Sequence, residues 1–230
     1  ETQKQKEINP VRSKTPSASA VPLVRASNGI KIKNGNDWHL LPVSSLRGTA
    51  IAFLFDEEEK MFFLLPEGFS EFFSVPEALL GSREAQEFFA STGGVELITH
   101  DLKLFLKHAP FAAGWGAFFD CKLAWFITDP GRRDYSLEKL LSWFLQKDAA
   151  SVGRAEILAL LPHIARRLRE DLGKNELLRV FEEFEMPLPP ILAAMERWGI
   201  GVNTAYLAKL SHKTGGEIAT LEKKICDFAG

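Results

Sequence analysis

Cysteine is scarce in this chain, and long apolar runs are missing from it. Only two of the 230 residues are cysteines, Cys121 and Cys226, and they lie too far apart for a C-x-x-C pair. A disulfide framework or a structural zinc site is therefore disfavoured, and a reducing, cytoplasmic compartment is expected. No apolar run approaches the roughly 18 residues of a membrane-spanning helix, so we expect no membrane association.

An excess of charge of one sign is lacking as well. The 28 Lys and Arg residues stand against 30 Asp and Glu residues, which gives a formal net charge of -2. A histone-like or tail-type nucleic-acid binder is therefore disfavoured, although a local basic face is not. The hydrophobic content of 46% is enough for a sizeable core in one domain, or in one domain and part of another.

Three stretches of different composition follow one another along the chain. Residues 1–28 contain no aromatic side chain and are expected to be a flexible linker, because such a segment buries too little apolar surface to offset its ordering entropy. The runs DWHLLPV, TAIAFLF and KMFFLL then predict strands, and the acidic turn from Asp56 to Glu59 makes a hairpin of the last two. After the strand VELIT the chain is predicted to be helical. Residues 174–230 form a separate helical segment, whose last helix Asn203 can cap.

The C-terminal segment carries an ordered series of proline, Met-Glu and glycine positions ahead of a long helix that ends in Ala229-Gly230. The series is Glu185, Pro187, Leu188, Leu192, Met195, Glu196, Gly199, Ile200 and Val202. It resembles the pattern E-x-P-L-x-x-x-L-x-x-M-E-x-x-G-[IV]-x-[VL] of family A DNA polymerases (bacterial DNA polymerase I). In that family the pattern precedes a long helix that ends in A-G and begins the thumb of the polymerase domain.

A second stretch resembles the 3′–5′ exonuclease domain that lies upstream in this family. FDCKLAWFITDPGRRDYSLEKLLSWFL is similar to D-T-x-L-x-x-Y-L-L-D-P and the helix that follows it, and HDLKLFL is similar to N-L-K-Y-D. The resemblance implies an α/β fold with a ribonuclease-H-like (DEDD exonuclease-like) mixed sheet and flanking helices over residues 29–173. The all-helical extension over residues 174–230 would then be the truncated start of the polymerase domain.

Two metal-ligand positions of the exonuclease family have changed in this chain. Such nucleases hold two divalent cations with a cluster of carboxylates, because Mg²⁺ prefers hard oxygen ligands. Phe105 stands where N-L-K-Y-D has its aspartate, and Arg154 is the residue expected at the aspartate of a late Y-x-x-x-D motif. Neither Tyr135 nor Tyr206 has an aspartate four residues later. The resemblance therefore implies a degenerate domain with no catalytic residue and no metal.

The D-x-E motif of the family leaves two interpretations open. Asp56-Glu57-Glu58 is the only D-x-E in the chain, and Asp56, Glu58 and Asp101 would be the ligands of an active nuclease. We favour a solvated turn, because IAFLF and KMFFLL resemble the family's second and third strands, with DWHLLPV as the first. Asp101 is then expected to cap a helix or to accept a hydrogen bond.

The function expected from this resemblance is that of a fragment of a DNA-directed DNA polymerase I-like protein, with a structural exonuclease-like domain. The parent would be a monomeric, cytoplasmic, Mg²⁺-dependent nucleotidyltransferase of DNA replication or repair. This chain alone would be inactive and need no cofactor. The alternatives are an active 3′–5′ exonuclease that uses Asp56 and Glu58, and a freestanding non-catalytic interaction module. The local cations available for DNA are Lys209, Lys213, Lys223 and Lys224 on the last helix, and the group Arg166, Arg167 and Arg169.

Overall fold

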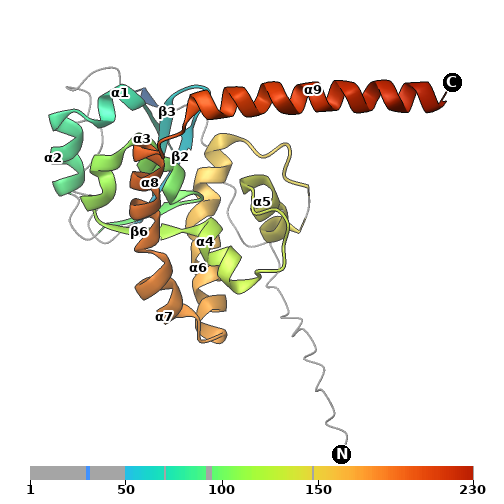
Figure 1. The fold of residues 1–230 in the computed structure, drawn as a ribbon. Helices are drawn as coiled ribbons and strands as arrows, with labels where there is room; N and C mark the ends of the chain where they lie inside the picture. The colour runs from blue at the N-terminus through green and yellow to red at the C-terminus, as the bar shows by residue number, and fades with distance from the viewer. Residues whose placement is uncertain (1–29, 32–49, 70, 92–94, 147, 230) are drawn as a thin grey trace, which may run out of the picture. The chain divides into compact units, whose positions relative to one another are not determined.

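Six strands form one mixed sheet in the part of the chain that the computed structural model describes, residues 30–31, 50–69, 71–91, 95–146 and 148–229. The order across the sheet is β1-β4-β3-β2-β5-β6 (Figure 1). The predicted linker 1–28 and the predicted strand DWHLLPV lie outside the described residues. The strands are Ile30–Lys31 (β1), Ala50–Asp56 (β2), Met61–Pro66 (β3), Phe73–Pro76 (β4), Glu96–Thr99 (β5) and Ala117–Asp120 (β6).

The hairpin predicted around the acidic turn is confirmed. β2 and β3 pair antiparallel from Ile51 opposite Pro66 to Asp56 opposite Met61. β4 continues the antiparallel part on the far side of β3, whereas β5 pairs parallel with β2, and β6 parallel with β5. β2 is therefore the strand at which the antiparallel part of the sheet meets the parallel part.

The position of β2 corrects one strand assignment. The hypothesis that IAFLF is the second strand requires a separate first strand ahead of it. Among the described strands none lies between β2 and β5, because their backbones pair directly from Ala50 opposite Glu96 to Ala52 opposite Ile98. β2 itself therefore holds this central place, and Asp56 ends a central strand while its acidic neighbours form the turn.

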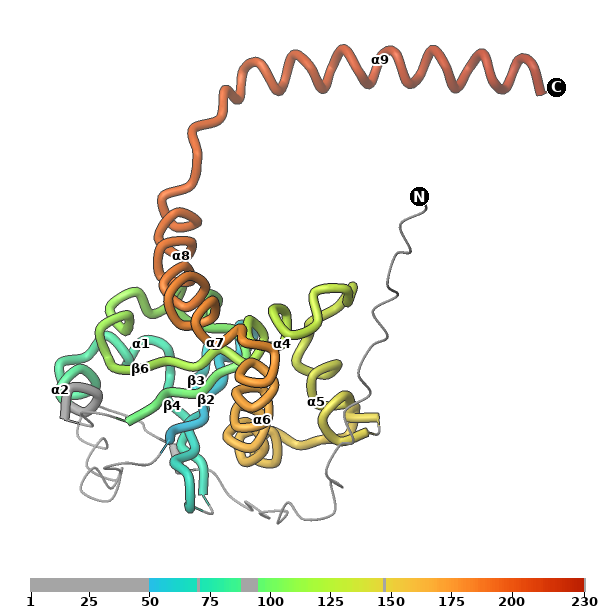
Figure 2. Tube along the Cα trace, turned by 90° about the horizontal axis from the view of Figure 1, so that it is seen from below, coloured from blue at the N-terminus to red at the C-terminus, as the bar shows by residue number. Residues whose placement is uncertain are grey.

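Helices cover both faces of the sheet. Successive side chains of a strand point to opposite faces, and here both faces are apolar. Ile51 and Phe53 pack with α1, α2 and α3 on one face, and Ala52 packs with α4, α5 and α6 on the other (Figures 1 and 2). The helices of this part are Glu77–Leu80 (α1), Arg83–Ser91 (α2), Leu102–His108 (α3), Cys121–Thr128 (α4), Leu137–Leu145 (α5) and Arg154–Lys174 (α6), with a 3₁₀ turn at Pro110–Gly114.

The chain divides into two compact units, Glu1–Ala194 and Met195–Gly230. Phe181 and Ala193 are buried in the first unit, so this unit extends past residue 174, where the sequence predicts the start of the polymerase segment. The elements here are Leu178–Val180 (α7), a π-helical turn at Phe181–Glu185, and Leu188–Trp198 (α8).

The second unit contains the long helix Thr204–Ala229 (α9). Its predicted cap is confirmed, because the backbone N–H of Tyr206 donates to the Asn203 side chain at 2.9 Å. Most of its large apolar side chains are exposed, among them Leu207 and Leu221. None of the described helices is both long enough and apolar enough to cross a membrane.

Candidate functional site

Three aspartates lie where parallel strands end. β2, β5 and β6 run in the same direction, so their carboxyl ends meet at one edge of the sheet. Asp56 is the last residue of β2, Asp101 follows β5, and Asp120 is the last residue of β6. In open α/β sheets ligands bind at this edge. This carboxyl edge is therefore the candidate site, and its chemistry depends on what each aspartate contacts.

Asp56 is engaged on both of its oxygens. Oδ1 accepts the backbone N–H groups of Glu58 and Glu59, each at 3.0 Å, which closes the turn. Oδ2 accepts Nη2 of Arg154 at 2.9 Å, and the same nitrogen lies 3.1 Å from Glu59. Arg154 begins α6, and its guanidinium lies 3.9 Å from the centre of the Phe63 ring. The guanidinium of Arg154 thus neutralises the Asp56 carboxylate, which a metal ion would need as a ligand.

A histidine ties the same acidic turn to the other face of the sheet. Nε2 of His108, at the end of α3, lies 3.2 Å from Glu57, and its Nδ1 lies 3.0 Å from Glu77 on α1. The His108 ring also packs on Phe55, with 4.4 Å between the ring centres. Glu58 is exposed, and its backbone N–H forms part of the turn. The turn therefore joins β2–β3 to α6 on one side and to α1 and α3 on the other.

Phe105 is buried in a cluster of aromatic rings. It is 3% exposed. Aromatic pairs whose ring centres lie about 4.5–7 Å apart stabilise a core beyond what the burial of their area alone contributes. A carboxylate at this position would have to replace an apolar contact surface rather than enter a polar cleft. The ring centres around Phe105 are those of Phe53 at 4.6 Å, Phe62 at 5.0 Å, Trp115 at 6.0 Å and Phe118 at 6.2 Å.

Asp101 and Asp120 serve as caps of the two helices that follow them. Asp101 accepts the backbone N–H of Leu104 at 2.9 Å and the ammonium of Lys122 at 2.6 Å. The helix cap predicted for Asp101 is thus confirmed. Asp120 accepts the backbone N–H of Leu102 at 2.8 Å and of Leu123 at 3.1 Å, so it links the starts of α3 and α4.

These surroundings shift the pKa values at the edge in opposite directions. Burial raises the pKa of Asp120 to about 7, against the effect of the backbone hydrogen bonds from Leu102, Leu123 and Lys122. Burial also raises the pKa of Asp101, but the hydrogen bonds from Lys122 and Leu104 outweigh it and leave this pKa below its usual value. Burial lowers the pKa of the neighbouring His100 to about 4, and its Nε2 lies 3.0 Å from the Tyr135 carbonyl.

The residues at this edge do not fit a pair of divalent cations. Among the residues that the structure describes, no three His, Cys, Asp or Glu side chains lie together as a metal ion requires. The oxygens of Asp56, Asp101 and Asp120 already accept hydrogen bonds from backbone, lysine or arginine donors. Two-metal chemistry needs carboxylates that converge on the ions instead.

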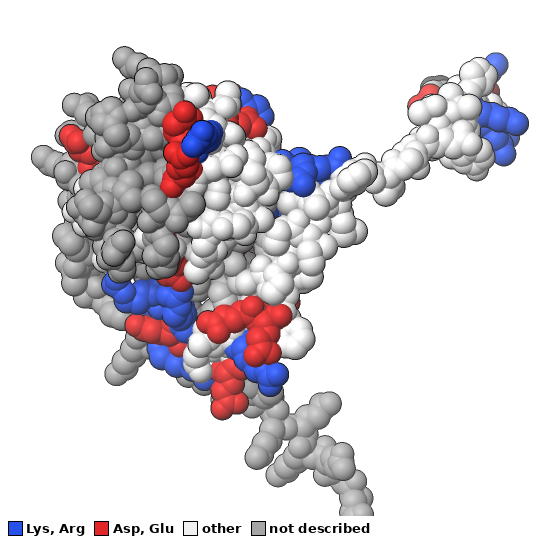
Figure 3. Space-filling view, turned by 90° about the vertical axis from the view of Figure 1, so that its left-hand side faces the viewer, with Lys and Arg blue, Asp and Glu red and all other residues white. Residues whose placement is uncertain are grey.

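The arginine group proposed as a local basic surface is paired with carboxylates instead. Arg166 donates to Glu67 at 3.3 Å, and Arg167 donates to Asp171 at 2.9 Å. Arg169 is bonded to Glu96. On the face drawn in Figure 3 acidic and basic side chains likewise lie beside one another. The lysines of α9, Lys209, Lys213, Lys223 and Lys224, are exposed, and Lys213 lies 3.9 Å from Glu217.

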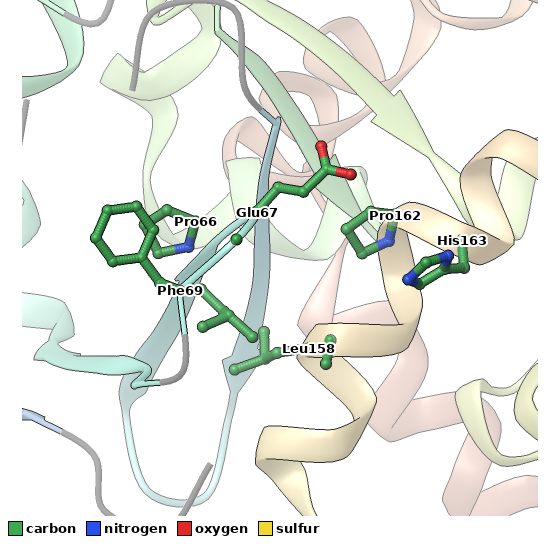
Figure 4. A pocket seen from close by; sticks show the side chains of 9 residues that line it. Pro66, Glu67, Phe69, Leu158, Pro162 and His163 are labelled. Carbon is green, nitrogen blue, oxygen red and sulfur yellow. The ribbon is translucent and has the colours of Figure 1, made fainter. Parts of the chain in front are cut away.

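A hollow of about 220 Å³ lies at the opposite end of β3 from the acidic turn. Pro66 and Phe69 form one wall, and Leu158, Pro162 and His163 of α6 form the other (Figure 4). The lining is mostly apolar. No cluster of catalytic side chains faces it, so the candidate site remains the carboxyl edge.

Sequence reasoning missed Lys122 and His108 as partners of the acidic residues. Lys122 lies 21 positions from Asp101, and His108 lies 51 positions from Glu57. A local sequence pattern cannot predict pairs between residues so far apart in the chain. The only available signal was that Asp101 and Asp120 each directly precede a helix, where aspartate is a preferred cap.

The fold is that of a ribonuclease-H-like domain, and ion pairs and aromatic packing occupy the carboxyl edge of its sheet. Solved structures show the same fold. The POL domain of Pol1 from M. smegmatis, solved with DNA primer-template and dNTP, matches 84% of this chain and 36% of its own length, at 21% identity and a TM-score of 0.61. Brucella melitensis NrnC bound to pGG matches 75% of this chain and 92% of its own, at 15% identity and a TM-score of 0.51.

The sequence relatives are bacterial DNA polymerases I, and the region that they match is similar to these family A DNA polymerases. DNA polymerase I of Bacillus subtilis is 31% identical over 155 residues, which cover 54% of this chain and 17% of the relative. The enzyme of Caldicellulosiruptor bescii is 26% identical over 194 residues, covering 82% of this chain and 22% of the relative. No protein-family model matches the chain. The predicted resemblance and the predicted ribonuclease-H-like fold are thus confirmed.

Proposed function

We propose that this chain is the catalytically silent exonuclease-like part of a DNA polymerase I-like protein, joined to the first helices of its polymerase domain. The observation that carries the proposal is the pairing of Arg154 with Asp56 and Glu59 at the carboxyl edge. In this proposal the guanidinium takes the position that a divalent cation would occupy in an active nuclease. Phe105, packed among four aromatic rings, supports the same conclusion at the second position.

The role of this part would be architectural. Its ion pairs tie the acidic turn to helices on both faces of the sheet, which gives the following helices a rigid support. The full protein would use Mg²⁺ at its polymerase centre, act as a monomer on DNA in replication or repair, and reside in the cytoplasm. The polymerase helices would begin near residue 174, within the compact unit that ends at Ala194.

A degradation assay on a labelled single strand of DNA tests the silent centre. With Mg²⁺ or Mn²⁺ present, the chain should leave the labelled 3′ end intact over a time in which an active exonuclease digests it. Stepwise shortening that disappears in Asp56→Ala would instead establish the rival function, an active nuclease built on Asp56 and Glu58. A variant of an exposed residue away from the edge, Glu84→Ala, is the matched control.

We further propose that the lysines of α9 contact DNA phosphates. Lys209, Lys213 and Lys224 share one face of the helix, whereas the apolar stripe lies on another. Binding by this chain alone should be weak and independent of sequence. Its affinity should fall steeply with salt, because phosphate contacts release counterions. Replacing the three lysines by glutamine should reduce the slope of log affinity against log salt concentration by about two to three. An unchanged slope would contradict the assignment.

A freestanding interaction module remains the second alternative. The exposed apolar side chains on α8 and α9, such as Trp198 and Phe228, are compatible with such a module. A reading frame that continues past Gly230 into palm and fingers motifs favours the polymerase, and a stop codon there favours the module.

A further inference from the structure

Three arginines of the described residues share one arrangement, in which the guanidinium lies between an aromatic ring and a carboxylate. The distances from the guanidinium carbon to the ring centre are 4.7, 3.9 and 4.6 Å. Such an arrangement combines a cation–π contact with a charge-assisted hydrogen bond. The three are Arg132 between Trp125 and Asp129, Arg154 between Phe63 and Asp56, and Arg169 between Phe119 and Glu96.

The cleft between α4 and α8 offers an aromatic ring and carboxylates in the same way, but none of its lining residues is an arginine. Its volume is about 270 Å³. Phe126 of α4 lines it and is 45% exposed. Asp101, Asp120 and Glu185 supply the carboxylates. An apolar cleft with a few converging polar groups, one of them with a shifted pKa, is the usual form of a binding site.

When Asp120 is ionised, three carboxylates face two ammonium groups in this cleft, which leaves one negative charge in excess. The titratable lining residues are Asp101, Asp120 and Glu185, together with Lys103, Lys122 and Tyr135. Lys122 is paired with Asp101 at 2.6 Å, and Tyr135 donates its hydroxyl to the Asp129 carbonyl. His100 does not line the cleft, and it stays neutral near pH 7, because burial lowers its pKa to about 4.

Asp120 is the buried carboxyl of this cleft, and no counter-charge is paired with it among the described residues. It is 4% exposed. Its oxygens accept backbone N–H groups, and none of the ion pairs found among the described residues includes it. A buried charge without a partner is costly, so Asp120 holds its proton up to about pH 7. A cation placed in the cleft would favour the ionised carboxylate, and binding would release this proton.

The rim of the cleft indicates what kind of molecule carries the cation. Leu188 and Leu192 of α8 are each 41% exposed beside it. A free guanidinium would leave this apolar surface in water, whereas a polypeptide covers it with the neighbours of an arginine. Arginine suits the position better than lysine, because its planar, weakly hydrated group stacks on a ring while it binds carboxylates.

We propose that the cleft between α4 and α8 binds an arginine side chain of a partner polypeptide. The guanidinium lies on the Phe126 ring and faces the carboxylates of Glu185 and Asp120, and apolar neighbours of the arginine cover Leu188 and Leu192. The cleft includes Asp101 and Asp120 of the carboxyl edge, and the binding test below is separate from the degradation assay for the silent centre.

Isothermal titration with acetyl-Leu-Arg-Leu-amide, and with the same peptide carrying citrulline in place of arginine, tests the proposal. Citrulline keeps the shape and removes the charge, so it should bind at least about tenfold more weakly. The affinity of the arginine peptide should rise up to about tenfold between about pH 6 and about pH 8, as Asp120 ionises. Equal affinity of the two peptides, or no saturable binding of either, would overturn it.

Two pairs of variants locate the binding within the cleft. Phe126→Leu removes the ring and should weaken binding about fivefold, as the loss of a cation–π contact of about 1 kcal/mol implies. Phe111→Leu is the matched control, since Phe111 is 39% exposed and does not line the cleft. Glu185→Gln should weaken binding, and Glu138→Gln on α5 should not. If Phe126→Leu and Glu185→Gln fold and bind as the wild type does, the cleft is not the site.

Discussion

Replacing Phe105 by aspartate restores the carboxylate that the exonuclease motif carries at this position. The ring that it removes is 3% exposed and has four aromatic neighbours between 4.6 and 6.2 Å. Deleting a buried phenylalanine side chain costs about 3–5 kcal/mol. An unpaired carboxylate in the same apolar place adds to this cost. The sum is a large share of the roughly 5–15 kcal/mol by which a domain is stable.

Urea unfolding of Phe105→Asp and Phe105→Leu, with and without Mn²⁺, measures this effect. Phe105→Leu keeps an apolar side chain and should cost about 1 kcal/mol. Phe105→Asp should be largely unfolded at 25 °C or lose most of its free energy of unfolding, and Mn²⁺ should not restore it. An aspartate variant that is as stable as the wild type, or that Mn²⁺ stabilises, would refute the view that aromatic packing has replaced the metal cleft.

Two further predictions concern the carboxyl edge. Arg154→Met should cost about 1 kcal/mol, since the ion pair with Asp56 is partly exposed, and a double-mutant cycle with Asp56→Asn should give a coupling of about 0.5–1 kcal/mol; a coupling near zero would contradict the pairing. The pH dependence of stability should be nearly flat between about pH 4 and 6.5 as far as His100 and Asp120 are concerned, because the pKa of His100 is lowered to about 4 and that of Asp120 is raised to about 7. In this window the unfolded chain binds the proton of His100 and has lost that of Asp120, so the two slopes oppose each other. Thermal unfolding across the window should show stability that rises with pH in Asp120→Asn and falls with pH in His100→Asn, and parallel curves for both variants would disprove the opposition.

Much of the fold could be predicted from the sequence because its signals are local. The hairpin of β2 and β3 follows from two apolar runs around an acidic turn, and α3 follows from the capping aspartate Asp101. The short strands β4 and β6, of four residues each, were missed, since so few residues show no alternation. The stretch EALLGSREAQEFFAS after Pro76 forms two helices, α1 and α2, separated at Gly81 and Ser82.

The candidate site was predictable only in part, because its contacts join distant parts of the chain. The resemblance singled out Phe105 and Arg154, but not the rings around the first or the pairing of the second with Asp56. Arg154 and Asp56 are 98 positions apart. Arg169 resembled a free cation for the same reason, since its partner Glu96 belongs to another element 73 positions away.

Calorimetric titration with Mn²⁺ tests most directly whether the carboxyl edge has lost its two-metal centre. With Arg154 on Asp56 and Phe105 among aromatic rings, the wild-type chain should show no saturable site tighter than roughly millimolar, the weak end of carboxylate sites. Saturable binding of two ions well below that concentration, lost in Asp56→Ala, would contradict the account.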